Sequence, residues 1–116
     1  MRKDDLVRLR HMLDAAKEAM SFAQNKTRND LDTDRMLTLS LVQSILIIGE
    51  AASRVTKECQ KDLAEIPWPD IIAMRNRLIH AYFDINLSVL WRTVVEDLPP
   101  LVATLETIVA SVENNV

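Results

Sequence analysis

One short stretch of the chain combines side chains that suit chemistry at a phosphodiester. Arg75, Asn76, His80 and Tyr82 all fall within "RNRLIHAYFDIN". An imidazole can accept and donate protons near neutral pH, a guanidinium can hold a phosphate through two hydrogen bonds, and the Asn76 amide can orient either group. A cleavage of RNA by such residues would need no metal ion. It would use the substrate 2′-hydroxyl as the nucleophile and leave a 2′,3′-cyclic phosphate and a 5′-hydroxyl.

The position of Arg75 on its helix is unusual for a charged residue. On a helix turning about 100° per residue, Arg75 lies in the middle of the apolar face, between Ile71 and Ile79. Because arginine is rarely buried without a partner, we expect either an ion pair, with Glu50 as the candidate, or a cleft or subunit interface at this face. His80 lies about 140° away from Arg75 on an ideal helix. The two can converge only if the helix is distorted or if a second copy of the chain completes the site.

Spacing alone does not distinguish this site from ordinary helix chemistry. Under a purely structural interpretation, Arg75 pairs with Glu50, His80 caps a helix end and Tyr82 is a buried aromatic residue. His11 is expected at the surface. A basic N-terminal set is expected to form a solvated face, with a small chance of contacting RNA: Arg2, Lys3, Arg8 and Arg10.

The elements that must position these residues are helices. Apolar residues recur at helical spacing over residues 4–25, 34–62, 67 to 80 or 82, 87–97 and 101–112. Gly49 lies inside the second segment, where it would let another helix backbone approach closely. The expected result is an all-α, four- to five-helix up-and-down bundle, with residues 1–116 forming a single domain.

The helix ends carry recognisable signals. Asp32 or Thr33 is the expected N-cap of the second helix, and Asn86 or Ser88 that of the fourth. The prolines at 99 and 100 are expected to interrupt the helical run after residue 97.

Composition restricts the class of protein. The 116 residues carry a net charge of −3 and one cysteine, Cys59, which excludes an internal disulfide and a cysteine-based metal cluster. No secretory signal is apparent, and the longest apolar stretch, "ILIIG", is too short to span a bilayer. We therefore expect a cytoplasmic protein with no cofactor. Nucleic-acid binders are usually basic, so the overall charge argues mildly against a stable nucleic-acid partner without excluding a local basic cleft.

The motif and its surroundings resemble the HepT-like (DUF86) branch of the HEPN superfamily. The family pattern is an arginine, four residues, a histidine, one residue and a tyrosine, which here reads Arg75, "NRLI", His80, Ala81 and Tyr82. The segments around the motif also resemble the family: "ILIIGEAASRV", "IPWPDIIAM" and "VLWRTVVEDLPPLVATLE". The resemblance covers nearly all of the chain from the second helix onward.

This resemblance implies a function and a set of roles. It implies a homodimer with the motif in a cleft between subunits, and a metal-independent endoribonuclease toxin of a type VII-like toxin–antitoxin pair. Arg75 and His80 map onto the catalytic pair, and Asn76 onto the polar residue after the arginine. The implied partner is an MNT-type nucleotidyltransferase antitoxin, which uses ATP to AMPylate the residue matching Tyr82 and forms a larger hetero-oligomer in some cases.

Two further hypotheses remain beside the ribonuclease. One is a non-catalytic HEPN-type binding module that pairs with a nucleotidyltransferase. The other is a purely structural helical dimer in which His80 affects stability alone.

Overall fold

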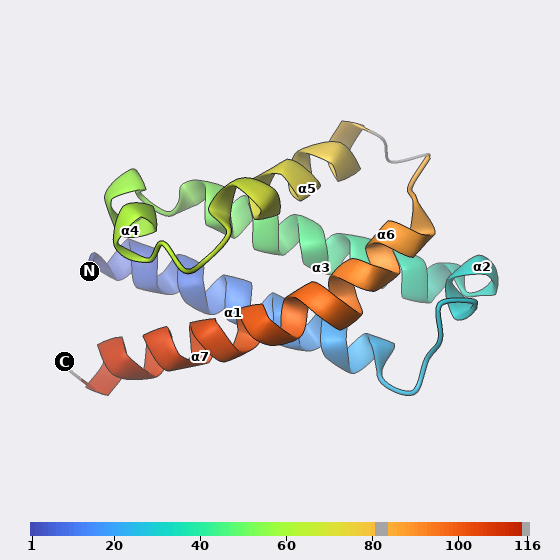
Figure 1. The fold of residues 1–116 in the computed structure, drawn as a ribbon, viewed down its shortest axis with the longest axis horizontal. Coiled ribbons are helices and arrows are strands. Elements are labelled where there is room, and N and C mark those ends of the chain that lie inside the picture. Colours follow the sequence, from blue (N-terminus) through green and yellow to red (C-terminus); the bar gives the residue numbers. More distant parts are fainter. Residues whose placement is uncertain (81–83, 115–116) are drawn as a thin grey trace.

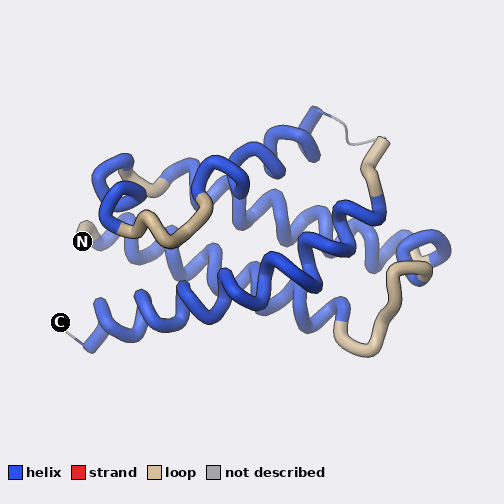
Figure 2. Tube along the Cα trace, viewed as in Figure 1, coloured by secondary structure: helices blue, strands red, loops and turns tan. Residues whose placement is uncertain are grey.

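Four long helices alternate in direction along the chain. The structure is a computed structural model that describes residues 1–80 and 84–114. The long helices are α1 (Lys3–Ala23), α3 (Arg35–Arg54), α5 (Trp68–His80) and α7 (Leu98–Asn114). They run up and down, and the N- and C-terminal ends lie at the same end of the bundle (Figure 1). The shorter elements lie at the bundle ends or lead into α7 (Figure 2): α2 (Asp30–Thr33), α4 (Lys57–Asp62), α6 (Leu87–Arg92) and a π-helical turn η1 (Thr93–Asp97).

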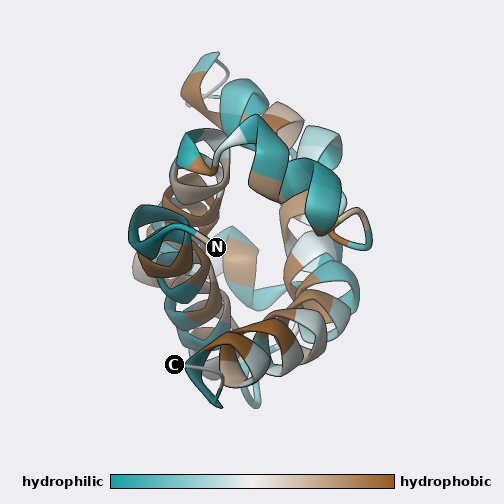
Figure 3. Cartoon of the chain, turned by 90° about the vertical axis from the view of Figure 1, so that its left-hand side faces the viewer, coloured by the Kyte–Doolittle hydropathy of each residue, from teal (hydrophilic) through white to brown (hydrophobic). Residues whose placement is uncertain are grey.

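The core forms where the apolar stripes of these helices meet. α3 is the central element, packing against both α1 and α5, while α7 packs against α1. Apolar residues lie mainly on the sides of the helices that face one another (Figure 3). The largest fully buried side chains come from α1, α3, the segment before α5, α6, η1 and α7: Leu9, Met12, Leu41, Val42, Ile66, Leu90, Val94 and Leu105. The expected all-α up-and-down bundle is confirmed.

α3 is also the one described helix whose length and composition would allow it to cross a membrane. The longest uninterrupted apolar run therefore underestimates how apolar this segment is, because most residues on both sides of Ser44 and Gly49 are also apolar. Half of its apolar window is nevertheless buried inside the bundle. Contacts with α1 and α5 account for its apolar character, as they would for any central core helix.

The helix predicted over residues 34–62 is in fact two helices. α3 ends at Arg54, and Val55 and Thr56 are extended, with ψ of 135° and 149°. The Thr56 hydroxyl accepts a hydrogen bond from the Cys59 N–H at 3.2 Å and so caps α4. The sequence analysis missed this break because a threonine N-cap inside an amphipathic pattern leaves the apolar spacing nearly unchanged.

The predicted N-cap of this helix is also wrong by one or two residues. Asp34 caps α3, with its carboxylate accepting from the Leu37 N–H at 3.0 Å. Asp32 and Thr33 instead belong to the short helix α2. At the fourth helix the prediction of Asn86 is confirmed, because its side chain accepts from the Val89 N–H.

The prolines at 99 and 100 do not interrupt the last helical run. α6, η1 and α7 follow one another without a break from Leu87 to Asn114. A proline lacks an N–H, and its ring crowds the carbonyl four residues earlier. Those carbonyls belong to Val95 and Glu96, both inside the wider π-turn. Two prolines therefore produce a π-turn rather than the helix end that was predicted.

Candidate functional site

Arg75 lies where α5 crosses closest to α3. A Cβ atom added to Gly49 would overlap the Cβ of Arg75, and it would lie 2.7 Å from the Arg75 Cγ and 3.3 Å from the Ile71 carbonyl oxygen. Only a glycine therefore permits this crossing. The expectation that Gly49 allows another helix to approach closely is confirmed. The side chain that packs against Gly49 is that of Arg75.

A carboxylate shared between two arginines holds the Arg75 side chain. Arg75 Nη1 donates to Glu50 Oε2 at 3.2 Å, and Arg54 Nε donates to Glu50 Oε1 at 3.0 Å. The Arg75 side chain is 21% exposed, against 48% for Glu50. The ion pair that the helical wheel suggested is therefore present, but it is only half-buried, and such pairs contribute little to stability.

The ion pair does not satisfy Arg75 completely. Its Nε is buried and has no hydrogen-bond partner among the residues that the structure describes. A buried donor without a partner costs about 1–3 kcal/mol. The Arg75–Glu50 ion pair, with an Nε that has no partner among the described residues, therefore adds little to the stability of the fold. It is consistent with a guanidinium that is positioned to bind a ligand.

The polar end of Arg75 borders a cavity of about 380 Å³ between α1, α3 and α5. α1 contributes Arg8 and His11, and α5 contributes Arg75 and Ile79. α3 supplies the floor through a stripe of residues: Gln43, Leu46, Ile47, Glu50, Ala51 and Arg54. Guanidinium groups thus reach this cavity from three different helices.

His80 borders a different cavity. It lies at the end of α5 and, with Arg77 and Asp84, lines a hollow of about 430 Å³ that continues to Asn86 at the start of α6. α5 remains a regular α-helix through His80, so the divergence expected from the helical wheel persists within one chain. Asn76 is exposed and lines neither cavity. Tyr82 lies outside the described residues.

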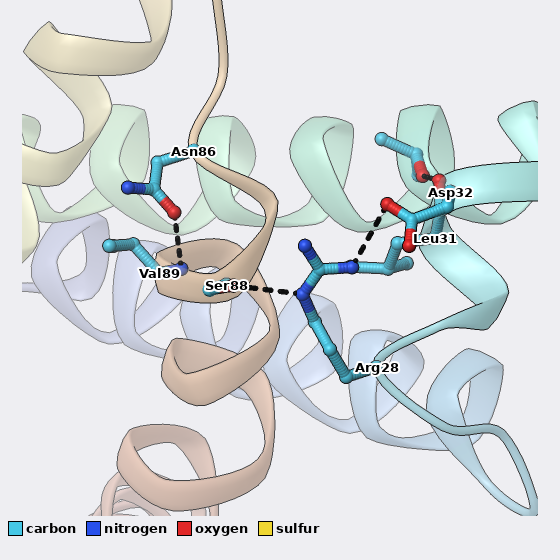
Figure 4. A network of polar contacts seen from close by, with 7 residues as sticks. Arg28, Leu31, Asp32, Asn86, Ser88 and Val89 are labelled. Atoms are coloured by element: carbon cyan, nitrogen blue, oxygen red, sulfur yellow. Dashed lines mark hydrogen bonds and ion pairs between the residues drawn. The ribbon is translucent and has the colours of Figure 1, made fainter.

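A polar network fixes the segment that follows the motif. Asn86 caps α6, and Ser88 Oγ receives a hydrogen bond from Arg28 Nε at 2.9 Å. Arg28 Nη1 also donates to Asp32 Oδ1 at 3.1 Å (Figure 4). The connection between α1 and α3 therefore holds the start of α6, which forms one wall of the His80 cavity.

Two other features bear on ligands. A cavity of about 470 Å³ lies between α3, α5 and the η1–α7 segment, and it holds none of the described motif residues. Its apolar walls carry four carboxylates, from Glu65, Asp70, Glu96 and Asp97, which would repel a phosphate. Among the described residues, no three histidine, cysteine or acidic side chains gather closely enough to hold a metal ion.

The helices and the arginine-lined cavity define a small all-α bundle protein. Within that class the chain belongs to the HepT-like ribonuclease family, whose model, described as "Ribonuclease HepT-like", matches residues 12–108. The family resemblance seen in the motif is thereby confirmed.

Relatives of known name agree with this assignment. A Caldanaerobacter subterraneus subsp. tengcongensis protein provisionally named as an RNase is 33% identical over 80% of this chain and 83% of its own length. A Thermococcus cleftensis protein provisionally named ribonuclease HepT is 36% identical over 72% of this chain and 80% of its own.

A longer relative comes from Methanocaldococcus jannaschii. It is named a gamma-glutamylcyclotransferase and, provisionally, an RNase, and it is 31% identical over 99% of this chain. The chain spans only 52% of the length of that protein. No solved structure is significantly similar to the chain.

Sequence reasoning considered Arg8 among the basic N-terminal residues, but it did not place Arg8, His11 or Arg54 beside Arg75. Arg54 follows Glu50 at the i,i+4 spacing typical of helical ion pairs, and this signal was available. Arg8 and His11 carried no such signal, because their approach to Arg75 depends on how α1 packs on α3.

Proposed function

We propose that this protein is a metal-independent endoribonuclease that acts as the toxin of a toxin–antitoxin pair. The observation that carries the proposal is the Arg75 guanidinium, held by Glu50 at the edge of an arginine-lined cavity. Such a group is suited to stabilise the charge that develops on a phosphate in the transition state. Membership of the HepT-like family and the RNase names of its relatives support the same activity.

The proposed reaction is a transesterification. The substrate 2′-oxygen attacks the adjacent phosphorus, the bond from phosphorus to the 5′-oxygen breaks, and the products are a 2′,3′-cyclic phosphate and a 5′-hydroxyl. One proton moves from the 2′-oxygen to the leaving 5′-oxygen, with His80 as the group that relays it. Arg75 binds the phosphate, and Asn76 orients the phosphate or His80. No water is consumed and no cofactor takes part.

The site is proposed to need two copies of the chain. Within one chain Arg75 and His80 border separate cavities, so they do not face one reacting phosphate. Ile47 and Ile79, which border the Arg75 cavity, are 40% and 50% exposed. Exposed isoleucines beside a functional cavity are typical of an association surface. A homodimer that places His80 of the second copy opposite Arg75 would complete the site.

Regulation is proposed to act on Tyr82. An MNT-type nucleotidyltransferase antitoxin, in the same cytoplasm, would transfer AMP from ATP to the Tyr82 hydroxyl and release pyrophosphate. The adenylyl group would add bulk and negative charge close to His80 in sequence, and it would oppose an RNA phosphate. Mass spectrometry of the protein made with and without this partner tests the idea, with Tyr82→Phe as the control. An unmodified Tyr82 after exposure to the active partner and ATP would contradict it.

The nuclease itself is tested with labelled RNA in the presence of a chelator. We expect cleavage products ending in a cyclic phosphate, and a loss of at least about 100-fold in rate for Arg75→Ala and for His80→Ala. Arg92→Ala, which removes an exposed arginine on α6 outside the Arg75 and His80 cavities, should retain wild-type activity. Intact RNA after incubation with unmodified wild-type dimer would refute the proposal.

One observation favours a second candidate, the non-catalytic binding module. The Arg75–Glu50 ion pair gives Arg75 a structural partner without any substrate. Under this alternative the protein forms a stable complex with a nucleotidyltransferase that survives His80→Ala, and it cleaves no RNA. The cleavage assay therefore separates the two candidates.

A further inference from the structure

We propose that the cavity between α1, α3 and α5 binds a second phosphate of the RNA backbone, next to the one held by Arg75, through Arg8, His11 and Arg54. This inference deepens the proposed function and rests on it for the identity of the ligand. It assigns a role to three residues that lie outside the motif and come from helices other than α5.

The spacing of the lining residues shows that the cavity follows the helices rather than arising from one irregular loop. On α1, Arg8 and His11 are three residues apart and so share a face. On α3, Gln43, Glu50 and Arg54 recur at intervals of seven and four residues, which again share a face. Both helices pack against each other, so these faces have fixed relative positions.

The charges in the cavity favour an anion. Three guanidinium groups line it against one carboxylate, that of Glu50. Both Glu50 oxygens are already engaged, one by Arg54 and the other by Arg75. The cavity therefore carries an excess of two positive charges within a chain whose net charge is −3. This local excess answers the objection that an acidic protein is poorly suited to RNA.

Arg8 differs from its neighbour Arg10 in a way that points to a ligand. Arg10 lies on an exposed part of α1 and pairs with Glu113 of α7. Arg8 is half-buried beside the cavity, and it makes no ion pair with any described residue. A partly buried guanidinium without a counter-ion is well placed to bind a phosphate, because folding has already removed part of its hydration shell.

The rest of the lining suits a nucleotide rather than an acidic peptide. His11 and Gln43 offer side-chain hydrogen-bond donors, and Leu46 and Ala51 offer apolar surface beside them on the floor of the cavity. A nucleotide presents a phosphate next to the apolar faces of its sugar and base, which matches this combination. A cavity of about 380 Å³ accommodates one such unit.

The test is a binding titration on wild-type protein, with the His11 imidazole resonances as the reporter. The probes are inorganic phosphate and a 2′-O-methyl oligoribonucleotide, which lacks the nucleophile and is not cleaved. We expect saturable shifts of the His11 signals with both probes, and tighter binding of the oligonucleotide. Arg8→Ala should weaken oligonucleotide binding about five- to tenfold, whereas Arg10→Ala should change it less than twofold. The loss should shrink as salt is raised, because a phosphate contact is removed.

Kinetics separate failure of this inference from failure of the proposed function. If RNA is cleaved, Arg8→Ala should raise KM and leave kcat unchanged, because Arg8 contacts a phosphate that does not react. Cleavage with an unaltered KM in Arg8→Ala would overturn the second phosphate site and leave the nuclease intact.

The binding titration also stands without any cleavage. Unshifted His11 signals with both probes, or equal binding by Arg8→Ala and wild type, would overturn the inference whether or not RNA is cut. Binding of poly-glutamate as tightly as the oligonucleotide would also overturn it, because the cavity would then select an acidic protein partner.

Discussion

At the scale of single residues, Gly49 and Arg75 depend on each other. The motif arginine lies at the closest crossing of α3 and α5, where an added Cβ on residue 49 would overlap its side chain. The sequence predicted both halves of this contact, the tolerance for close approach at Gly49 and the unusual position of Arg75 on an apolar face. It did not predict that the two residues touch each other, because that depends on the register between two helices.

Gly49→Ala tests this contact through the sign of its effect on stability. By helix propensity alone, the substitution should stabilise the protein by about 1 kcal/mol. Because the new methyl group meets Arg75 at a backbone crossing, we expect instead a loss of about 1–3 kcal/mol. Urea unfolding measures the difference, with Ser53→Ala on an exposed turn of the same helix as the control. A more stable Gly49→Ala protein would show that the crossing of α3 and α5 leaves room for a methyl group beside Arg75.

Cys59 provides a pH-dependent prediction at the same scale. Burial raises the pKa of the Cys59 thiol above its ordinary value, and the nearby carboxylates of Asp5 and Asp62 raise it further. The native state therefore holds the thiol proton more tightly than the unfolded state does. The resulting stabilisation is complete below the unfolded pKa of about 8.5 and declines as the pH rises through the higher native pKa.

The measurement compares unfolding free energies of wild type and Cys59→Ala at pH 7.5 and at higher pH. We expect the advantage of the wild type to shrink as the pH rises above about 8.5. Native Cys59 should also react more slowly with a thiol reagent than the unfolded chain at the same pH. A difference between the two proteins that grows with pH would contradict the direction of the shift.

At the scale of helices, Asp5 connects the first turn of α1 to the start of α4. Asp5 is 2% exposed, and its carboxylate accepts hydrogen bonds from the Thr56 N–H at 2.9 Å and the Thr56 hydroxyl at 2.7 Å. The sequence presented Asp4 and Asp5 as equivalent acidic residues among basic ones. Only the packing of α4 shows that Asp5 is buried and hydrogen-bonded to Thr56, the N-cap residue of α4, while Asp4 is exposed.

The pair Asp5→Ala and Asp4→Ala is therefore a matched comparison. Removing the Asp5 carboxylate leaves the Thr56 N–H without an acceptor, which should cost about 1–3 kcal/mol. Asp4→Ala should change stability by less than about 0.5 kcal/mol, as is usual for exposed sites. Thermal unfolding measures both variants. Equal midpoints for the two would mean that Asp5 does not hold α4 in place.

Helix content and order were predictable from the sequence, and so was the Asn86 cap, but the breaks between helices were not. Apolar spacing predicted each long helix, and the structure confirmed the bundle. The break at Thr56 and the π-turn before Pro99 depend on hydrogen bonds and ring contacts that leave the apolar spacing intact. Sequence patterns therefore located the helices that carry Arg75 and Glu50, but not the short elements between them.

At the scale of the whole molecule, the candidate site remains incomplete within one chain. Arg75 and His80 border separate cavities, and α5 is not distorted in a way that would bring them together. The helical wheel predicted this separation from sequence alone. It could not show which surfaces flank each residue, and it therefore did not place Arg8, His11 and Arg54 beside Arg75. A partner copy is the simplest way to bring an imidazole to the Arg75 cavity.

The most direct test of this account is complementation between two inactive variants. Arg75→Ala and His80→Ala should each abolish RNA cleavage as homodimers. When they are co-expressed or refolded together, half of the dimers are mixed, and each mixed dimer carries one site with an intact Arg75 from one copy and His80 from the other. We expect recovery of about a quarter of wild-type activity in this mixture. If each chain used its own Arg75 and His80, the mixture would stay inactive, and the proposed two-copy site would be wrong.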